Sequence, residues 1–171
     1  AGCPWITCTG GVSPLGSTDT NTTFSTLPIA VAIRSLAPSV RIIGVEPEGA
    51  PKMTQSLLAG EPVRLASVRS IADGLMAVRP GDLTFPLIQT LVDEIVTVAD
   101  RAIAEAVRWL FAHTRLVAEP SGAATVAAVL TRAPASWARD GRTTSREPGG
   151  PIVAVISGGN VDADAFARYI A

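Results

Sequence analysis

Apolar residues gather in three short, β-branched runs that predict buried strands. The runs cover residues 40–45, 94–98 and 152–156, and each is bounded by polar residues, Gly or Pro. Runs without polar alternation are typical of parallel strands that are covered on both faces. Residues 5–8 form a weaker fourth candidate. The pattern therefore predicts a buried, mainly parallel sheet.

Helical spacing fills the intervals between these runs. Thr84, Asp100 and Ser121 stand where N-cap side chains precede a helix, and Gly60 stands where a left-handed residue ends one. Alternation of strands and helices favours an α/β fold, an open, mainly parallel twisted sheet with flanking helices. The predicted helices cover residues 28–36, 53–59, 85–92, 101–114, 122–130 and 162–171.

Two segments interrupt the alternation. Residues 9–27 are rich in Gly, Ser and Thr, and residues 132–150 combine Arg, Pro and Gly without apolar periodicity. The second segment is predicted to be a solvated insertion loop before the last strand. Its arginines have no aromatic platform beyond Trp137, so we do not expect them to bind nucleic acid.

Composition narrows the class of protein. The chain has 171 residues and a net charge of −1, which suits one globular domain without affinity for nucleic acid or anionic membranes. No apolar run approaches the roughly 18 residues of a membrane span, and the first residues do not resemble a signal peptide. Cys3, Cys8 and His113 cannot complete a zinc site. A reduced, cytoplasmic protein is the expectation.

The strongest candidate for a functional site is the segment that follows the last predicted strand. Ser157-Gly158-Gly159-Asn160 stands between that strand and a helix, where ligands of open α/β sheets bind. A serine hydroxyl there can pair with a ring nitrogen, and glycines let the main chain approach a ligand. A plain structural turn explains the same four residues equally well. Glu46, Gly74 and Glu119 stand in other turns and are weak signals individually.

Five sequence segments, taken together and in their order along the chain, resemble one protein family, although none of them is specific alone. They read GVEPEGAPKMTQSLLAGEPV, SIADGL, FPLIQTLVDEIVTV, LVAEPSGAATVAAVL and VAVISGGNVD. Over residues 28–171 the chain resembles the C-terminal half of the pyridoxal-phosphate-dependent threonine and serine dehydratases, the threonine ammonia-lyase and serine racemase family. The resemblance implies fold type II, of which this half supplies most of the larger domain. It also implies α,β-elimination of L-threonine or L-serine to a 2-oxo acid and ammonia.

The resemblance also implies roles for individual residues. Ser157, followed by Gly158, would contact the pyridine nitrogen of the cofactor, Gly74 would lie on a loop at the substrate side, and Glu119 would form part of the pocket wall. Glu46 and Ala50 fall on two positions that bind a divalent cation in serine racemase-like members. The third position, normally Asp, is Lys52. A cation in place of an anionic ligand argues against metal binding.

The N-terminal segment, residues 1–27, matches the family poorly. Counting back without gaps places residues 21–24 (NTTF) where the glycine-rich phosphate loop is expected. An alternative register uses Gly10 and Gly11 as a shortened loop followed by an insertion. Both registers remain open, and only the second keeps main-chain amides accessible to phosphate without crowding by side chains.

The expected catalytic activity depends on whether the chain contains the lysine that binds the cofactor. The family's Schiff-base lysine lies in a Ser-x-Lys block of the N-terminal half, whereas Lys52 is the only lysine here and lies in another motif. We therefore expect a dehydratase-family chain that is inactive alone. Such a chain would form a homo-oligomer or pair with an N-terminal half.

Two other function classes stay open. A non-catalytic binding module would keep the scaffold and expose apolar surface. A Rossmann-type nucleotide binder would use Gly10, Gly11 and Glu46, but its glycine spacing is absent.

Overall fold

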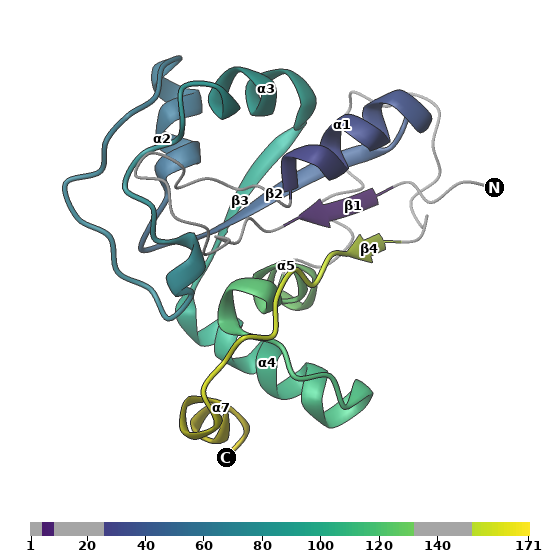
Figure 1. Ribbon diagram of the computed structural model, residues 1–171, viewed down its shortest axis with the longest axis vertical. Helices are drawn as coiled ribbons and strands as arrows, with labels where there is room; N and C mark the ends of the chain where they lie inside the picture. The colour runs from purple at the N-terminus through teal and green to yellow at the C-terminus, as the bar shows by residue number, and fades with distance from the viewer. Residues whose placement is uncertain (1–4, 9–25, 132–151) are drawn as a thin grey trace.

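A single parallel sheet organises the chain. The computed structural model describes residues 5–8, 26–131 and 152–171. Within these residues the strands are β1 (Trp5–Cys8), β2 (Arg41–Pro47), β3 (Glu94–Val98) and β4 (Ile152–Ala154). The sheet order is β3-β2-β1-β4, and every neighbouring pair is parallel (Figure 1). The predicted α/β class with a parallel sheet is confirmed.

Helices cover both faces of this sheet. Figure 1 shows α1, α2 and α3 on one side, α4 and α5 on the other, and α7 beside α4. The described helical elements are α1 (Thr26–Leu36), α2 (Lys52–Ala59), the 3₁₀ turn η1 (Asp73–Leu75), α3 (Thr84–Leu91), α4 (Asp100–Thr114), α5 (Pro120–Thr131) and α7 (Ala163–Ile170).

The two faces have separate apolar cores, which explains why the strands lack polar alternation. The larger core joins β2 and β3 to α4 and α5, through residues such as Val45, Val96 and Val107. The smaller core lies under α2 and α3 and includes Met53, Phe85 and Ile88. Because side chains of a strand alternate between faces, Ile95 packs on the second core while Val96 packs on the first.

Gly60 ends α2 as the sequence predicts. It has a φ of 78°, in the left-handed region that favours glycine, and a Cβ built there would meet nothing within 4 Å. The final helix α7 begins directly after Asp162, also as predicted.

The predicted N-caps at Thr84 and Asp100 are wrong. Both residues lie inside the first turn of their helices, and neither α3 nor α4 has a side-chain cap. The Thr84 hydroxyl donates to the carbonyl of Gly81 instead. The Asp100 carboxylate accepts from the Ser70 hydroxyl and the Ile71 amide. Contacts with a distant loop outweigh the local capping preference of Asp100.

The strand β1 belongs to the sheet although it lies in the poorly matching segment 1–27. It pairs with β2 on one side and with β4 on the other. Gly10 and Gly11 follow β1 along the chain and lie outside the described residues, as does the predicted insertion loop at 132–150. No described helix has both the length and the apolar character of a membrane span.

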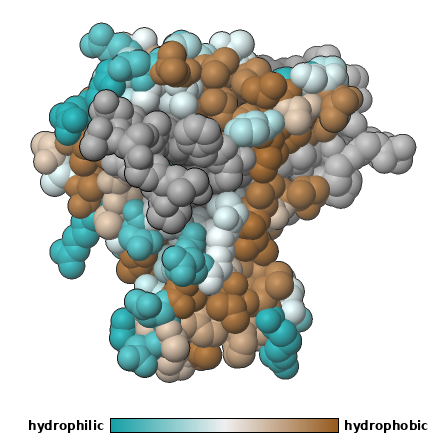
Figure 2. Space-filling model, in the orientation of Figure 1, coloured by the Kyte–Doolittle hydropathy of each residue, from teal (hydrophilic) through white to brown (hydrophobic). Residues whose placement is uncertain are grey.

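Apolar side chains are also left at the surface. Figure 2 shows brown residues in contact with one another on the face drawn. Among the described large apolar side chains, exposed fractions are highest at Leu36 and Leu58, 85% each, and Leu83, 86%. They are 49% at Leu116, 50% at Val117 and 37% at both Val153 and Ile156. Single exposed apolar side chains are common in globular proteins, whereas contiguous apolar patches mark surfaces that contact a partner.

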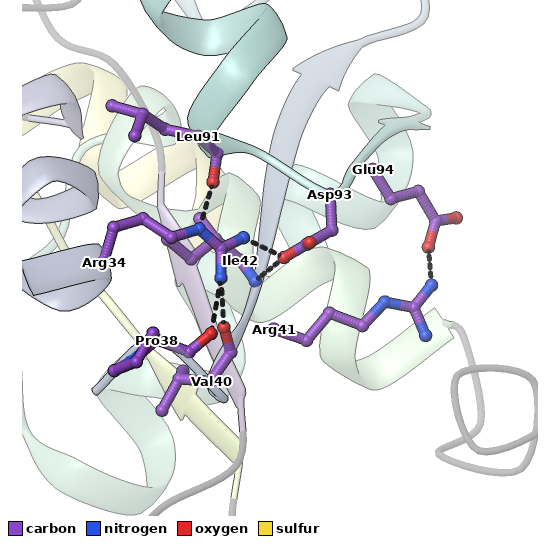
Figure 3. A network of polar contacts seen from close by, with 8 residues as sticks. All are labelled: Arg34, Pro38, Val40, Arg41, Ile42, Leu91, Asp93 and Glu94. Atoms are coloured by element: carbon purple, nitrogen blue, oxygen red, sulfur yellow. Dashed lines mark hydrogen bonds and ion pairs between the residues drawn. The ribbon is translucent and has the colours of Figure 1, made fainter. Parts of the chain in front are cut away.

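Arg34 connects the amino end of β2 to the amino end of β3 (Figure 3). Its guanidinium donates to the Leu91 carbonyl at 2.9 Å and to the Val40 carbonyl at 2.8 Å, and it pairs with the Asp93 carboxylate. The same carboxylate accepts from the Ile42 amide at 2.7 Å. One side chain thus joins the end of α1, the start of β2 and the turn before β3.

We expect Arg34→Met to lower the free energy of unfolding by about 2 kcal/mol, because several charge-assisted hydrogen bonds are lost together. Urea denaturation followed by circular dichroism measures the change. Arg101→Met is the matched control, since Arg101 pairs with Glu105 on the exposed face of α4, where an ion pair contributes about 0.3–0.5 kcal/mol. Equal losses for the two variants would contradict this account.

Candidate functional site

Three segments meet at the carboxyl edge of the sheet. The first is residues 157–160, which follow β4, the second is the entry to α5, and the third is η1. The Glu119 amide donates to the Gly158 carbonyl at 3.1 Å. In return, the main-chain amide of Asn160 donates to the Glu119 carboxylate. These reciprocal contacts fix the Ser-Gly-Gly-Asn segment on the entry to α5.

Glycines make this close approach possible. A Cβ on Gly122 would lie 2.5 Å from the Gly158 carbonyl oxygen, and one on Gly159 would lie 2.7 Å from the Val117 carbonyl oxygen. Real Cβ atoms do not approach main-chain oxygens so closely, so larger residues would push the two segments apart. The glycines therefore keep two stretches of main chain in direct contact.

The turn η1 joins the same edge through the main chain of Gly74. Its amide donates to the Ser121 hydroxyl at 3.0 Å and to the Asp73 carboxylate at 2.8 Å. Ser121 is completely buried inside α5, so the N-cap predicted for it is wrong and its hydroxyl holds η1 instead. The structure thus brings Gly74, Glu119 and Gly158 to one edge of the sheet.

The Glu119 carboxyl group is half-buried at this junction. Burial raises its pKa, and the negative charge of the nearby Asp73 raises it further, while the Asn160 amide acts in the opposite direction. Desolvation and a like charge both disfavour the ionised form. The junction therefore contains a carboxyl group that keeps its proton to a higher pH than an exposed glutamate.

Ser157 stands at the start of the Ser-Gly-Gly-Asn segment, and its surface is partly exposed. The preceding Val155 carbonyl accepts a hydrogen bond from the buried Thr125 hydroxyl at 3.0 Å. This bond anchors the chain after β4 to the middle of α5. The main chain is consequently fixed before Ser157, by Thr125 at Val155, and after it, by Glu119 at Gly158.

Glu46 lies apart from these residues, at the end of β2 and the start of α2. One carboxylate oxygen accepts from the Met53 amide at 2.8 Å, and the other accepts from the amide and hydroxyl of Thr54, each at 2.9 Å. A buried carboxylate that accepts the first amides of a helix compensates both its own desolvation and the helix's unpaired donors. Glu46 therefore caps α2.

The ammonium group of Lys52 lies beside the Glu46 carboxylate. Its ammonium donates to the Leu75 carbonyl at 2.9 Å and lies 3.9 Å from Glu46 Oε1. Burial lowers the pKa of Lys52, and the Glu46 charge partly offsets that effect. Lys52 thereby joins the start of α2 to the end of η1.

These residues do not fit a divalent cation. The Glu46 oxygens already accept from main-chain and hydroxyl donors, the Ala50 carbonyl accepts from the Lys52 amide at 2.9 Å, and the third position carries an ammonium. Within the described part of the chain, no group of three or more His, Cys, Asp or Glu residues could hold a metal ion.

Asp73, Ser121 and Asp100 were not predicted as members of the site. The sequence signal for the first two was present, because Asp73 belongs to the SIADGL block and Ser121 to LVAEPSGAA. The bond between Asp100 and Ser70 had no local signal, since the two residues are 30 positions apart. Only the sheet topology, which places the start of α4 beside the segment before η1, brings them together.

Comparison with known proteins shows the family of the chain. Residues 21–158 match the family model described as pyridoxal-phosphate dependent enzyme. The chain is 39% identical to an L-threonine ammonia-lyase of Thermotoga maritima over 142 residues, which are 83% of this chain and 32% of that protein. It is 41% identical to a serine racemase of Arabidopsis thaliana over 136 residues, which are 78% of this chain and 38% of that protein.

Solved structures give the same result. A maize serine racemase superposes with a TM-score of 0.74 at 32% identity, over 96% of this chain and 45% of that chain. The processed threonine deaminase isoform 2 of Solanum lycopersicum superposes with a TM-score of 0.76 at 30% identity, over 96% of this chain and 40% of that chain. The chain thus spans less than half the length of these similar proteins. It belongs to the family of pyridoxal-phosphate-dependent enzymes and has their type II fold.

Proposed function

We propose that this chain is part of an active site that converts L-threonine or L-serine to a 2-oxo acid and ammonia. It would supply the residues that face the pyridine ring of the cofactor and those that face the substrate. The junction of residues 157–160 with Glu119 and η1 carries the proposal. It combines the Ser157 hydroxyl, the Glu119 carboxyl group with its raised pKa, and closely packed glycine main chain at the carboxyl edge of a parallel sheet. Ligands of open α/β sheets bind at that edge.

The donor set at this edge fits pyridoxal phosphate. Ser157 is the residue that would meet the pyridine nitrogen, because a neutral hydroxyl can donate to it or accept from it. Gly158 would let the main chain approach the ring, and Gly10 and Gly11, which directly follow Thr9 after β1, would serve the phosphate. When bound, the cofactor supplies an electron sink for the carbanion at the substrate's α-carbon.

Glu119 would form part of the pocket wall, where burial and the charge of Asp73 raise the pKa of its carboxyl group. Gly74 would shape the substrate side, because its amide is held by Ser121 and Asp73. These two residues would orient a hydroxy-amino acid against the ring.

We further propose that the lysine that carries the cofactor is not part of this chain. Lys52 is its only lysine, and its ammonium is engaged by Leu75 and Glu46. The chain alone would then bind the cofactor without a covalent link and would not turn over substrate.

The first test adds pyridoxal phosphate to the purified chain and treats the mixture with borohydride. We expect saturable binding by fluorescence, no pyridoxyl adduct on Lys52 by mass spectrometry, and no 2-oxo acid from L-threonine.

Ser157→Ala should weaken binding of pyridoxal phosphate about 2- to 10-fold, which corresponds to the loss of one hydrogen bond. The control Ser35→Ala removes a hydroxyl that bonds within α1 and should change nothing. An adduct on Lys52 with turnover would overturn the lysine proposal, and equal affinity of both variants would overturn the role of Ser157.

Glu119 gives a pH-dependent prediction for stability. In the window between the ordinary glutamate pKa of about 4.3 and its raised folded value, the folded state binds more protons than the unfolded state. The free energy of unfolding that Glu119 contributes therefore falls as the pH rises through this window.

The variant Glu119→Gln removes this loss, so its free energy of unfolding should improve relative to that of the native chain as the pH rises above about 4.3. Urea titrations at several pH values measure the difference. Glu105→Gln, which removes an exposed carboxylate of α4, is the control. A constant difference across pH would show that Glu119 is not perturbed in the folded chain.

We also propose that the exposed apolar side chains are covered in the working enzyme, by further protein corresponding to the rest of the relatives' length or by a second copy. Leu116, Val117, Val153 and Ile156 support this proposal. Sizing chromatography with light scattering should find self-association of the isolated chain, and Val117→Ser with Ile156→Ser should reduce it. A native chain that stays monomeric at high concentration would count against coverage by a second copy.

A further inference from the structure

The side chain of Lys52 links three elements from a buried position. Lys52 begins α2, its ammonium donates to the carbonyl of Leu75 at the end of η1, and it lies beside Glu46 of β2. Only 11% of the side chain is exposed. An ammonium is strongly hydrated and is buried only where oxygen atoms replace its water. The surroundings of Lys52 therefore constitute a binding site for a positive charge.

The anionic side of this site has no capacity left for a second cation. A carboxylate offers about four lone-pair positions. In Glu46, the amides of Met53 and Thr54 and the Thr54 hydroxyl occupy three of them, and the positive charge of Lys52, 3.9 Å from Oε1, repels a second cation from the remainder. The nearby Ala50 carbonyl is engaged by the Lys52 amide.

We propose that the Lys52 ammonium takes the place of the divalent cation that the family resemblance assigns to positions 46, 50 and 52. As a cation attached to the chain, it positions η1 against α2 and requires no metal from solution. Its bond to Leu75 holds η1 from one side, while Ser121 holds the same turn through Gly74 from the other. Lys52 is thus a positioning residue for Asp73 and Gly74. This inference goes beyond the proposed function, and none of its tests uses the cofactor or substrate.

The native chain provides the first test. We expect its thermal midpoint to be the same in EDTA, in millimolar MgCl₂ and in millimolar CaCl₂, at constant ionic strength. A saturable rise of the midpoint by several degrees in either metal salt relative to EDTA would overturn the proposal.

Lys52→Asp provides the second test, because it replaces the ammonium by an oxygen ligand beside Glu46. The new carboxylate and the Glu46 oxygen that faced the ammonium are oxygen ligands of the kind that Mg²⁺ and Ca²⁺ prefer, and the second lone pair of the Ala50 carbonyl can add to them. In EDTA we expect the thermal midpoint to fall by about 5 °C or more, through repulsion between the two carboxylates. Added Mg²⁺ or Ca²⁺ should restore most of the loss. A midpoint that is unchanged in EDTA, or low in all three conditions while the chain stays folded, would contradict the proposal.

Lys52→Met covers the case in which the aspartate variant does not fold. Methionine keeps most of the side-chain volume and removes only the charge and the bond to Leu75. Hydrogen exchange at the amides of Gly74, Leu75 and Met76 should become about tenfold faster, because η1 opens more easily. Arg101→Met removes an exposed charge and should leave these amides unchanged. Unchanged exchange in Lys52→Met would show that the ammonium does not position η1.

Discussion

The main chain of residues 158–159 lies directly on the entry to α5, and the rest of the candidate site depends on that contact. Glycines at 122, 158 and 159 remove the side chains that would separate the two segments. The hydrogen bond from Glu119 to Gly158 then fixes their relative position. Because α5 also contacts β2 and β3, the segment after β4 is positioned by the whole sheet. Ser157 and Glu119 reach a common edge for this reason.

A second constraint acts on η1, which is held from both sides. Ser121 accepts the Gly74 amide, and Lys52 donates to the Leu75 carbonyl. Glu46 stabilises the start of α2 and balances the Lys52 charge, so β2, α2, η1 and α5 form one connected polar framework. Polar networks whose members are all satisfied make an arrangement specific. The main-chain groups of η1 are accordingly held by two buried side chains, Ser121 and Lys52.

Much of this architecture follows from the sequence, because apolar runs without alternation identify buried parallel strands and parallel strands place their carboxyl ends together. β3 and the left-handed Gly60 are predicted residue by residue. The roles of Ser121 and Asp100 are not, since a local capping rule competes with partners 47 and 29–30 positions away. The partnership of Lys52 with Leu75 is also non-local, and only folding defines it. Ser157 and Glu119 are found through block order, whereas the raised pKa of Glu119 requires the packed structure.

The central claim is that the junction of residues 157–160, Glu119 and η1 receives pyridoxal phosphate. Nuclear magnetic resonance of the ¹⁵N-labelled chain, titrated with the cofactor, tests it most directly. The account predicts saturable shifts of the amides of Gly74, Glu119, Gly158, Gly159 and Asn160, with amides of the exposed face of α4 unchanged. Shifts confined to other surfaces, or none at saturating cofactor, would contradict it.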